Sequence, residues 1–272
     1  MTSTVARWLL WARVAQWRHF LLLPLAGVDL AEGVAGNLSR LARAECACAS
    51  VLAFGYLLNA SRDRAMDLDP AKNPLAAEAP RDLTLPLALL ALTATLFAAS
   101  VSPLALCAAG ASLASGWCYS AGPRLKSVPL VGTAMNVTNF APLLFVGAAS
   151  ARDLARLAPL ALGFSALLVQ NQLLHEAADA DEDARGAVTT TFRAYGAWVS
   201  ALLAALCAGA LVSAAVLSAA SPWPAAVVGA VAPLTLALEP SAAVAHRARR
   251  AHRALSVVAG AALFAACVYR AR

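Results

Sequence analysis

The chain has 272 residues, of which 61% are hydrophobic and only 13% are charged. Soluble domains carry about 25% charged residues, so this composition excludes an ordinary water-soluble domain and indicates a polytopic membrane protein. The formal net charge is +6, but Lys and Arg lie in the loops between apolar runs, where membrane topology explains them better than nucleic-acid binding. No nucleic-acid partner is therefore expected.

Apolar runs of membrane length recur along the chain and predict an all-α fold. About 20 apolar residues in a helix cross a bilayer, so the length allows roughly nine transmembrane helices with loops. The spans are predicted at 18–36, 41–58, 84–101, 103–120, 128–149, 154–174, 194–218, 222–240 and 252–269. We predict that they form one domain over residues 1–272, a helical bundle around a central cavity.

The first polar segment follows directly after the apolar run 49–58. In it Asn59, Asp63 and Asp67 are spaced four residues apart, so on a helix they drift by only about 40° per step and line one face. A row of acids at the end of a membrane-length helix repels itself unless a cation lies between its members. Open oxygen ligands of this kind suit Mg²⁺ that carries substrate phosphates. The ordinary alternative is a charged loop.

A second polar segment, residues 170–186, also ends an apolar run. Asn171, His175, Asp179 and Asp183 again recur every four residues, with Glu176 beside them. Two such rows at two membrane boundaries can clamp one diphosphate through roughly two or three Mg²⁺ ions. The sequence His175-Glu176-x-x-Asp179 begins like an HExxH zinc helix, but an acid replaces the second His, which disfavours a zinc peptidase.

The two polar segments resemble the signatures NDxxDxxxD and DxxxD of the UbiA superfamily of intramembrane prenyltransferases. The first is written here as NASRDRAMD, residues 59–67, and the second as DADED, residues 179–183. Between them YSAGPRLK, residues 119–126, resembles the family's loop on the diphosphate side. One departure is Ala60, which stands where an acid is common, so the first row has one possible ligand fewer.

The resemblance implies Mg²⁺-dependent transfer of a prenyl group from a prenyl diphosphate to a lipophilic, often aromatic, acceptor within the membrane. The carboxylates that it implies for catalysis are Asp63, Asp67, Asp179 and Asp183. The Mg²⁺ ligands that it implies are these four together with Asn59 and Glu176. The diphosphate contacts that we expect are Arg124, Lys126, Tyr119, Lys72 and Arg64, because guanidinium and ammonium groups suit phosphate oxygens.

Three other functions use similar residues. A terpene cyclase of the same fold ionises the same diphosphate and lets an internal double bond capture the cation, so motif spacing does not separate it from a transferase. A cation-coupled transporter is expected to carry acids in the middle of its spans, whereas most acids here lie at span ends. A CDP-alcohol phosphotransferase has a signature of fixed Asp, Gly and Arg positions within one helix, which this sequence lacks.

The distribution of positive charge predicts the orientation in the membrane. With nine spans, fifteen of the 21 Lys and Arg residues lie at the N-terminus and after even-numbered spans, and six lie on the opposite side. This places both acidic segments on the cytoplasmic side of a multi-pass protein, in a bacterial cytoplasmic membrane, with the active site open to the cytoplasm. Spans one to four and five to eight each carry an acidic row and then a basic loop, which indicates a loose internal repeat.

Overall fold

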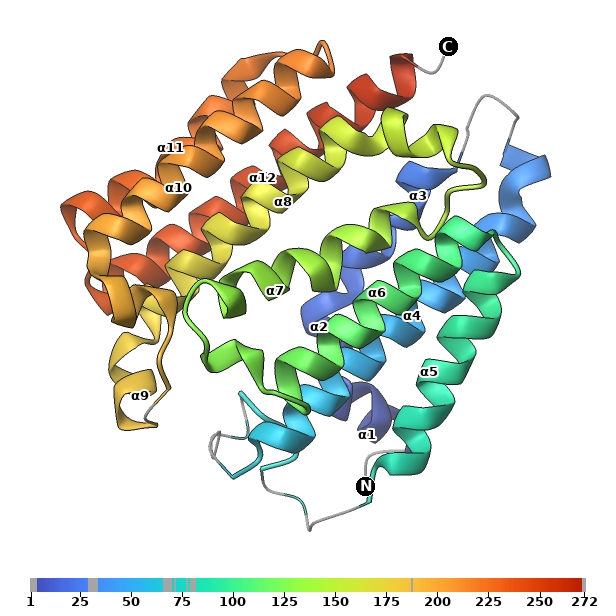
Figure 1. Cartoon of the computed structure of the whole chain (residues 1–272), viewed down its shortest axis with the longest axis horizontal. Helices are drawn as coiled ribbons and strands as arrows, with labels where there is room; N and C mark the ends of the chain where they lie inside the picture. The colour runs from blue at the N-terminus through green and yellow to red at the C-terminus, as the bar shows by residue number, and fades with distance from the viewer. Residues whose placement is uncertain are drawn as a thin grey trace. The chain divides into compact units, whose positions relative to one another are not determined.

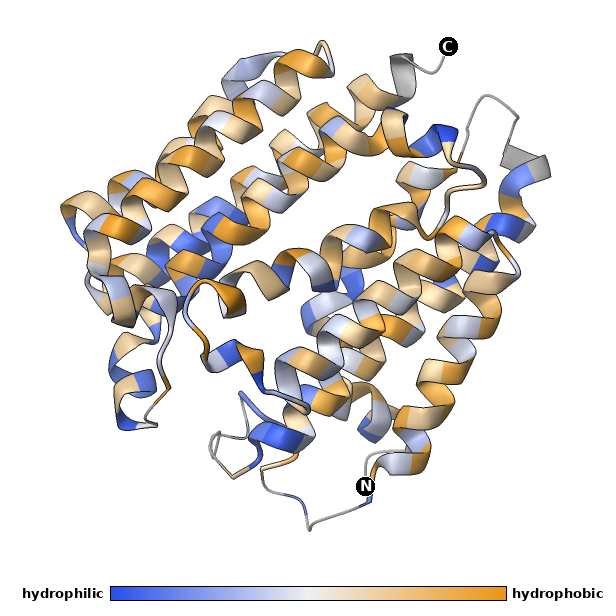
Figure 2. Ribbon diagram, viewed as in Figure 1, coloured by the Kyte–Doolittle hydropathy of each residue, from blue (hydrophilic) through white to orange (hydrophobic). Residues whose placement is uncertain are grey.

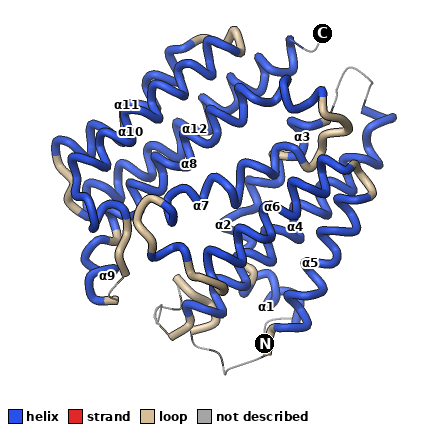
Figure 3. The backbone as a smooth tube through the Cα atoms, viewed as in Figure 1, coloured by secondary structure: helices blue, strands red, loops and turns tan. Residues whose placement is uncertain are grey.

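The computed structural model describes residues 4–28, 34–65, 70, 72–76, 78, 82–186 and 188–270, and every regular element among them is a helix (Figures 1 and 3). The chain divides into two compact units. The first unit is Met1–Arg124 with Pro142–Asp153, and the second unit is Leu125–Ala141 with Leu154–Arg272. The predicted all-α fold is confirmed for these residues, whereas the single domain and the internal repeat stay predictions.

The first unit is built around one long helix and two shorter ones. Its elements are α1 (Thr4–Trp11), α2 (Val14–Trp17), η1 (Arg18–Leu22), α3 (Pro24–Gly27), α4 (Val34–Asp63), α5 (Thr84–Ala99), α6 (Pro103–Ser120) and most of η4 (Ala141–Phe145). Helices α4, α5 and α6 pack against one another (Figure 1). Helix α4 runs past its predicted end at residue 58 as far as Asp63, so the first part of the acidic row is helical.

The described part of the predicted span 18–36 is not one continuous helix. The 3₁₀ helix η1 is followed by the short helix α3, which ends at Gly27 because Val28 is extended with φ −84° and ψ 128°. A Cβ on Gly27 would lie only 2.5 Å from the Ala148 amide nitrogen, and a Cβ on Gly147 would overlap the Pro24 carbonyl oxygen. Direct backbone contact between these two segments, which only glycine permits, therefore replaces a continuous helix.

Polar caps fix the start of α6, the helix that ends beside the first acidic row. The Ser102 hydroxyl accepts a hydrogen bond from the Ala105 amide at 3.0 Å and donates to the Ala148 carbonyl at 2.6 Å. Pro103 occupies the first helical position, where its missing amide hydrogen is not needed. The register of α6 is thereby set from its N-terminus, and Ser120 is its last residue.

The second unit consists mostly of long helices. Its elements are η3 (Leu125–Ser127), α7 (Val131–Phe140), α8 (Arg152–Ala178), α9 (Ala180–Arg185), α10 (Thr191–Leu217), α11 (Pro222–Leu238) and α12 (Ala242–Arg270). The predicted span 128–149 is not one continuous α-helix, because α7 gives way to the 3₁₀ helix η4 at Ala141. Pro142 has no amide hydrogen to continue the α-helical ladder, which explains the change.

A buried amide joins four helices of the second unit. Gln170 of α8 is completely buried, and its Nε2 donates to the carbonyls of Ala204 at 2.8 Å and Gly229 at 2.9 Å, on α10 and α11. Its Oε1 lies 3.1 Å from Nε2 of His252 on α12. Because both amide hydrogens are used, Oε1 must accept, so His252 carries its proton on Nε2.

Among the residues that the structure describes, three helices are long and apolar enough to cross a membrane: Asn37–Asp63, Arg152–Ala178 and Thr191–Leu217. Two shorter apolar helices are Thr84–Ala99 and Pro222–Leu238. Figure 2 shows apolar residues along most of α5, α10 and α11 and polar residues gathered in α9. Large apolar side chains are exposed on these helices, among them Leu89, Trp198 and Trp223, as expected of helix faces in lipid.

Candidate active site

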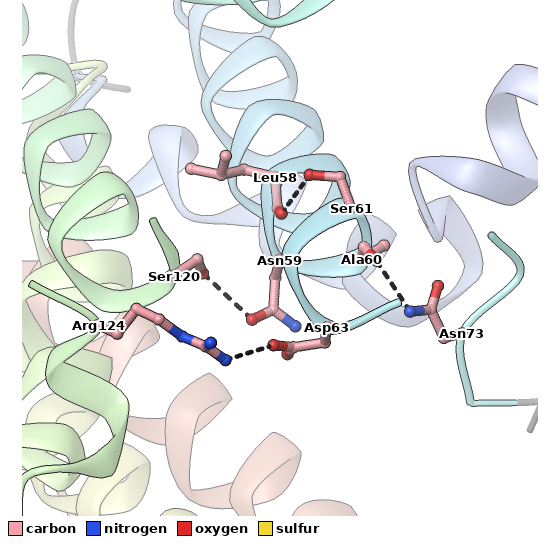
Figure 4. A network of polar contacts seen from close by, with 8 residues as sticks. All are labelled: Leu58, Asn59, Ala60, Ser61, Asp63, Asn73, Ser120 and Arg124. Carbon is pink, nitrogen blue, oxygen red and sulfur yellow. Dashed lines mark hydrogen bonds and ion pairs between the residues drawn. The ribbon is translucent and has the colours of Figure 1, made fainter. Parts of the chain in front are cut away.

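The ends of α4 and α6 bring the first acidic row together with the predicted diphosphate loop. The Asp63 carboxylate is buried, and its Oδ1 lies 3.4 Å from Nη2 of Arg124, whose side chain is 44% exposed. One turn earlier, the buried Ser120 hydroxyl donates to Asn59 Oδ1 at 3.1 Å (Figure 4). Two residue pairs, each 61 positions apart, therefore align α4 with α6.

Arg124 reaches Asp63 from an unusual backbone conformation. Its φ is 50°, in the left-handed region that a non-glycine residue rarely adopts. Such strain persists only where the surrounding structure holds it, and it occurs often at ligand sites. The exposed remainder of the guanidinium keeps donors available to a phosphate, since five N–H groups are present.

Ala60, the position where an acid is common in the UbiA superfamily, does not line this row. Its side chain is 1% exposed in an apolar cluster with Trp11, Leu57, Leu75 and Leu83. Its carbonyl accepts a hydrogen bond from the buried Asn73 amide at 2.8 Å (Figure 4). In this chain, position 60 anchors α1 and the following loop to the end of α4.

The remaining predicted residues of the first unit have different surroundings. Asp67 lies outside the described residues. Arg64 donates through Nη2 to the Glu78 carbonyl, so it holds the loop after α4. Tyr119, the penultimate residue of α6, and Lys72, in the loop after α4, are both half-buried.

The second acidic row spans the junction between α8 and α9. Helix α8 ends at Ala178, but the Asp179 amide donates to the His175 carbonyl at 3.0 Å and the Asp183 amide to the Asp179 carbonyl at 2.9 Å. The four-residue register that the sequence predicts is therefore kept across the junction. Asp181 and Glu182 are exposed, whereas Asp183 is half-buried.

Two histidines lie beside Asp179. Nδ1 of His175 is 3.2 Å from one carboxylate oxygen, and Nε2 of His246, on α12, is 3.9 Å from the other. Arg249, three residues further along α12, donates through Nε to Asn171 Oδ1 at 3.4 Å. The basic start of α12 thus runs beside the second row. The sequence predicts a lipid-headgroup anchor at residues 247–253, which include Arg249, and does not single out His246, although the i, i+3 spacing of the two residues places both on one helix face.

Asp183 has a pKa raised to about 6, because burial disfavours its charge and the carboxylates of Asp179 and Glu176 repel it. The Arg193 guanidinium acts in the opposite direction but does not cancel these effects. Arg193 also donates through Nη1 to the Asp183 carbonyl at 3.0 Å and to the Val188 carbonyl. A carboxylate held against other carboxylates gains from a bound cation.

Glu176 is buried and fully engaged by neighbours within the second unit. Its Oε1 accepts from the Thr133 hydroxyl at 2.8 Å and from Gln172 Nε2 at 3.2 Å, and its Oε2 accepts from the Phe192 amide at 3.0 Å. Lys126 lies in η3, where its carbonyl oxygen packs so closely on Gly132 that a Cβ there would be 2.6 Å away. Gly132 is the second residue of α7 and directly precedes Thr133, so the Lys126 carbonyl packs next to the residue that contacts Glu176.

The donor set fits a hard divalent cation. In the second unit Asp179 and Asp183 offer carboxylate oxygens one helical turn apart, and in the first unit Asn59 and Asp63 offer amide and carboxylate oxygens. Mg²⁺ takes one or two protein carboxylates and keeps sites for phosphate and water. Among the described residues, no group of three or more His, Cys, Asp or Glu side chains is placed to hold a metal ion.

Comparisons with known proteins identify the family of the chain and structures of the same fold. The profile of the UbiA prenyltransferase family matches residues 20–268. A solved digeranylgeranylglyceryl phosphate synthase has a TM-score of 0.77 at 15% identity, over 97% of this chain and 99% of that one. A UbiA homolog from Archaeoglobus fulgidus bound to GPP and Mg²⁺ has a TM-score of 0.65 at 17% identity, over 96% and 99% of the two chains.

The same homolog bound to DMAPP and Mg²⁺ has a TM-score of 0.64 at 17% identity, with the same coverage. No curated protein matches the chain at a significant level. At these identities the solved structures show a common fold, whereas the family profile covers nearly the whole chain. The chain therefore belongs to the UbiA prenyltransferase family.

Proposed function

We propose that this integral membrane protein transfers a prenyl group from a prenyl diphosphate to a lipophilic, aromatic acceptor, with Mg²⁺ as cofactor. The observation that carries the proposal is the Asp179–Asp183 pair, one helical turn apart, where mutual repulsion of carboxylates favours a bound cation. Family membership and the homolog that binds GPP and Mg²⁺ support the same assignment.

We assign the acidic residues to Mg²⁺ binding and the basic residues to phosphate binding. Asn59, Asp63, Asp67, Asp179 and Asp183 are proposed to hold Mg²⁺, which when bound supplies positive charge to the departing diphosphate. Arg124 and Lys126 are proposed to bind phosphate oxygens, with Tyr119, Lys72 and Arg64 as further candidates. Asp63 orients Arg124 through the 3.4 Å ion pair.

His246 and Arg249 extend the proposed diphosphate contacts. Both lie on the face of α12 that meets the second row. If Asp179 holds a cation, the Arg249 guanidinium would be placed to bind a phosphate oxygen beside it. A carbocation left by ionisation needs a surface without water, which apolar helices in lipid provide. The lipid phase also dissolves the prenyl tail and the acceptor.

We also propose the finer membrane architecture: about nine spans around a central cavity, with both acidic rows on the cytoplasmic side. The fifteen-to-six distribution of Lys and Arg supports this orientation. In this scheme the predicted spans 18–36 and 128–149, which are not single helices in their described residues, still cross, because membranes tolerate irregular backbone where other protein covers it.

Product analysis tests the proposed function. Purified protein in lipid nanodiscs is given prenyl diphosphates of several lengths, with and without aromatic acceptors, and the products are identified by mass spectrometry. Transfer predicts a prenylated acceptor and diphosphate release that depends on the acceptor. A cyclic hydrocarbon formed without any acceptor would support the cyclase instead, and no consumption of any prenyl diphosphate would contradict both.

A further inference from the structure

The Glu176 carboxylate ends a chain of hydrogen bonds that starts at Leu130, in the segment that joins η3, which bears Lys126, to α7. The Leu130 amide donates to the Thr191 hydroxyl at 2.8 Å. The hydroxyls of Thr191 and Thr133 are 2.6 Å apart, and Thr133 lies 2.8 Å from Glu176 Oε1. Thr133, Thr191 and Glu176 are all buried, so each of these groups depends on its protein partner.

The direction of this chain follows from the donors available. Both oxygens of Glu176 accept from N–H groups, those of Gln172 and Phe192, so the carboxylate acts as an acceptor toward Thr133 as well. The Thr133 hydroxyl has a single hydrogen, which it donates to Glu176. Thr191 must then donate to Thr133, while its oxygen accepts from the Leu130 amide. Hydrogen bonds aligned in one direction polarise and strengthen one another.

The same carboxylate closes the segment that carries the second acidic row. Phe192 is the second residue of α10, so its amide has no acceptor within the helix. Glu176 supplies that acceptor from the end of α8, and its negative charge suits a helix N-terminus. The polypeptide segment from Glu176 to Phe192, which includes Asp179 and Asp183, is thereby held at both ends by the Glu176 side chain.

We propose that Glu176 is a positioning residue rather than the Mg²⁺ ligand that its place in the motif suggests. Through Thr133 and Thr191 it fixes the turn that bears Lys126, and through Phe192 it fixes the segment that bears Asp179 and Asp183. The proposal rests on the proposed function of those groups. It adds that a buried chain of hydrogen bonds sets the distance between Lys126 and the Asp179–Asp183 segment, and that Glu176 does so without contacting the substrate.

Backbone amide exchange tests this chain of hydrogen bonds without a measurement of enzymatic activity. Thr133→Val removes one hydroxyl at nearly constant volume, and Glu176→Gln replaces the acceptor. Hydrogen–deuterium exchange of peptides that contain Leu130 and Phe192 should become at least about tenfold faster in both variants, since one buried hydrogen bond is worth a factor of this order. Thr138→Val is the matched control, because this exposed hydroxyl on the same helix donates to its own helix at Met135. Unchanged exchange in Thr133→Val would overturn the proposal.

Kinetics then separate a positioning residue from a ligand. Each variant should lower kcat/KM for the prenyl diphosphate about tenfold, with the half-saturating Mg²⁺ concentration within about twofold of wild type. The double variant should lose no more kcat/KM than the less active of the two single variants, because both substitutions break the same chain of hydrogen bonds. A tenfold rise in half-saturating Mg²⁺ for Glu176→Gln alone, with Thr133→Val at wild type, would make Glu176 a ligand and overturn the proposal.

A Lys126→Gln background tests the coupling to the turn. If the chain acts through Lys126, Thr133→Val should lower kcat/KM less in this background than in the wild type. A full tenfold loss there would overturn the coupling. Failure of the proposed function looks different, because wild-type protein would then turn over no prenyl diphosphate while the exchange results at Leu130 and Phe192 would stand.

Discussion

Nη2 of Arg124 lies 3.4 Å from Oδ1 of Asp63, which joins the loop after α6 to the last residue of α4. The pair is asymmetric, because the carboxylate is buried and the guanidinium is 44% exposed. The buried carboxylate of Asp63 thus lies beside a guanidinium whose exposed part has N–H donors that suit an anion such as a phosphate.

Asp63→Asn should lower kcat at least about a hundredfold while the protein remains folded, because loss of one preorganised electrostatic contact costs about 2.7–4 kcal/mol. Steady-state turnover in nanodiscs measures this, with melting temperature as the check on folding. Ser61→Ala is the control, since Ser61 only donates to the Leu58 carbonyl within the same helix. Equal losses in the two variants would mean that this turn acts through stability alone.

Asp179→Asn and Asp183→Asn should each reduce turnover at least about a hundredfold, whereas Asp181→Asn should stay close to wild type. The reason is that Asp181 is exposed to the surroundings, whereas Asp183 is half-buried beside the other carboxylates of the second row. Combining Asp63→Asn with Asp179→Asn should cost less than the sum of the single effects, because both serve one leaving group. An essential Asp181 beside a dispensable Asp183 would refute the assigned register.

Activity should require Mg²⁺ or Mn²⁺, disappear with excess chelator and return on adding Mg²⁺ but not zinc, because the proposed ligands are hard oxygens. The requirement should also depend on pH. Asp183, with its pKa raised to about 6, is protonated below that value and ionised above it. The half-saturating Mg²⁺ concentration should therefore fall as pH rises from about 5.5 to about 7.5 and level off above that range. Full turnover in chelator would exclude the Mg²⁺ mechanism.

Arg249→Gln should raise KM for the prenyl diphosphate about tenfold, because a charge-assisted contact to phosphate is lost. Arg250→Gln offers a matched control, since this neighbouring arginine of α12 is exposed. Initial rates over a range of prenyl diphosphate concentrations measure both. Equal KM values for the two variants would assign the whole basic start of α12 to lipid headgroups instead.

The loops at 59–83 and 175–193 should lie in the cytoplasm and the C-terminus outside it, because positive charge favours the cytoplasmic side. Single cysteines at positions 78 and 185, in a background without the native cysteines, can be labelled with a membrane-impermeant maleimide. Neither should react in intact cells, and both should react after permeabilisation. Labelling of position 78 from outside would reverse the orientation.

The sequence by itself determined the helical class and the spacing within each acidic row. Long apolar runs with few charges define helices in lipid, and a four-residue spacing follows from helix geometry alone. For this reason the register Asp179–Asp183 could be predicted, and it survives the junction of α8 and α9. The continuation of α4 to Asp63 likewise follows from local periodicity.

Only the tertiary structure decided which side chains meet. Arg124 reaches Asp63 across 61 positions and Thr133 reaches Glu176 across 43, and no local pattern encodes such distances. The breaks in the predicted spans 18–36 and 128–149 also depend on contacts, since Gly27 and Gly147 matter only because two backbones touch. Sequence spacing describes the face of one helix, whereas the choice between ligand and positioning residue at Glu176 depends on what other helices bring to that face.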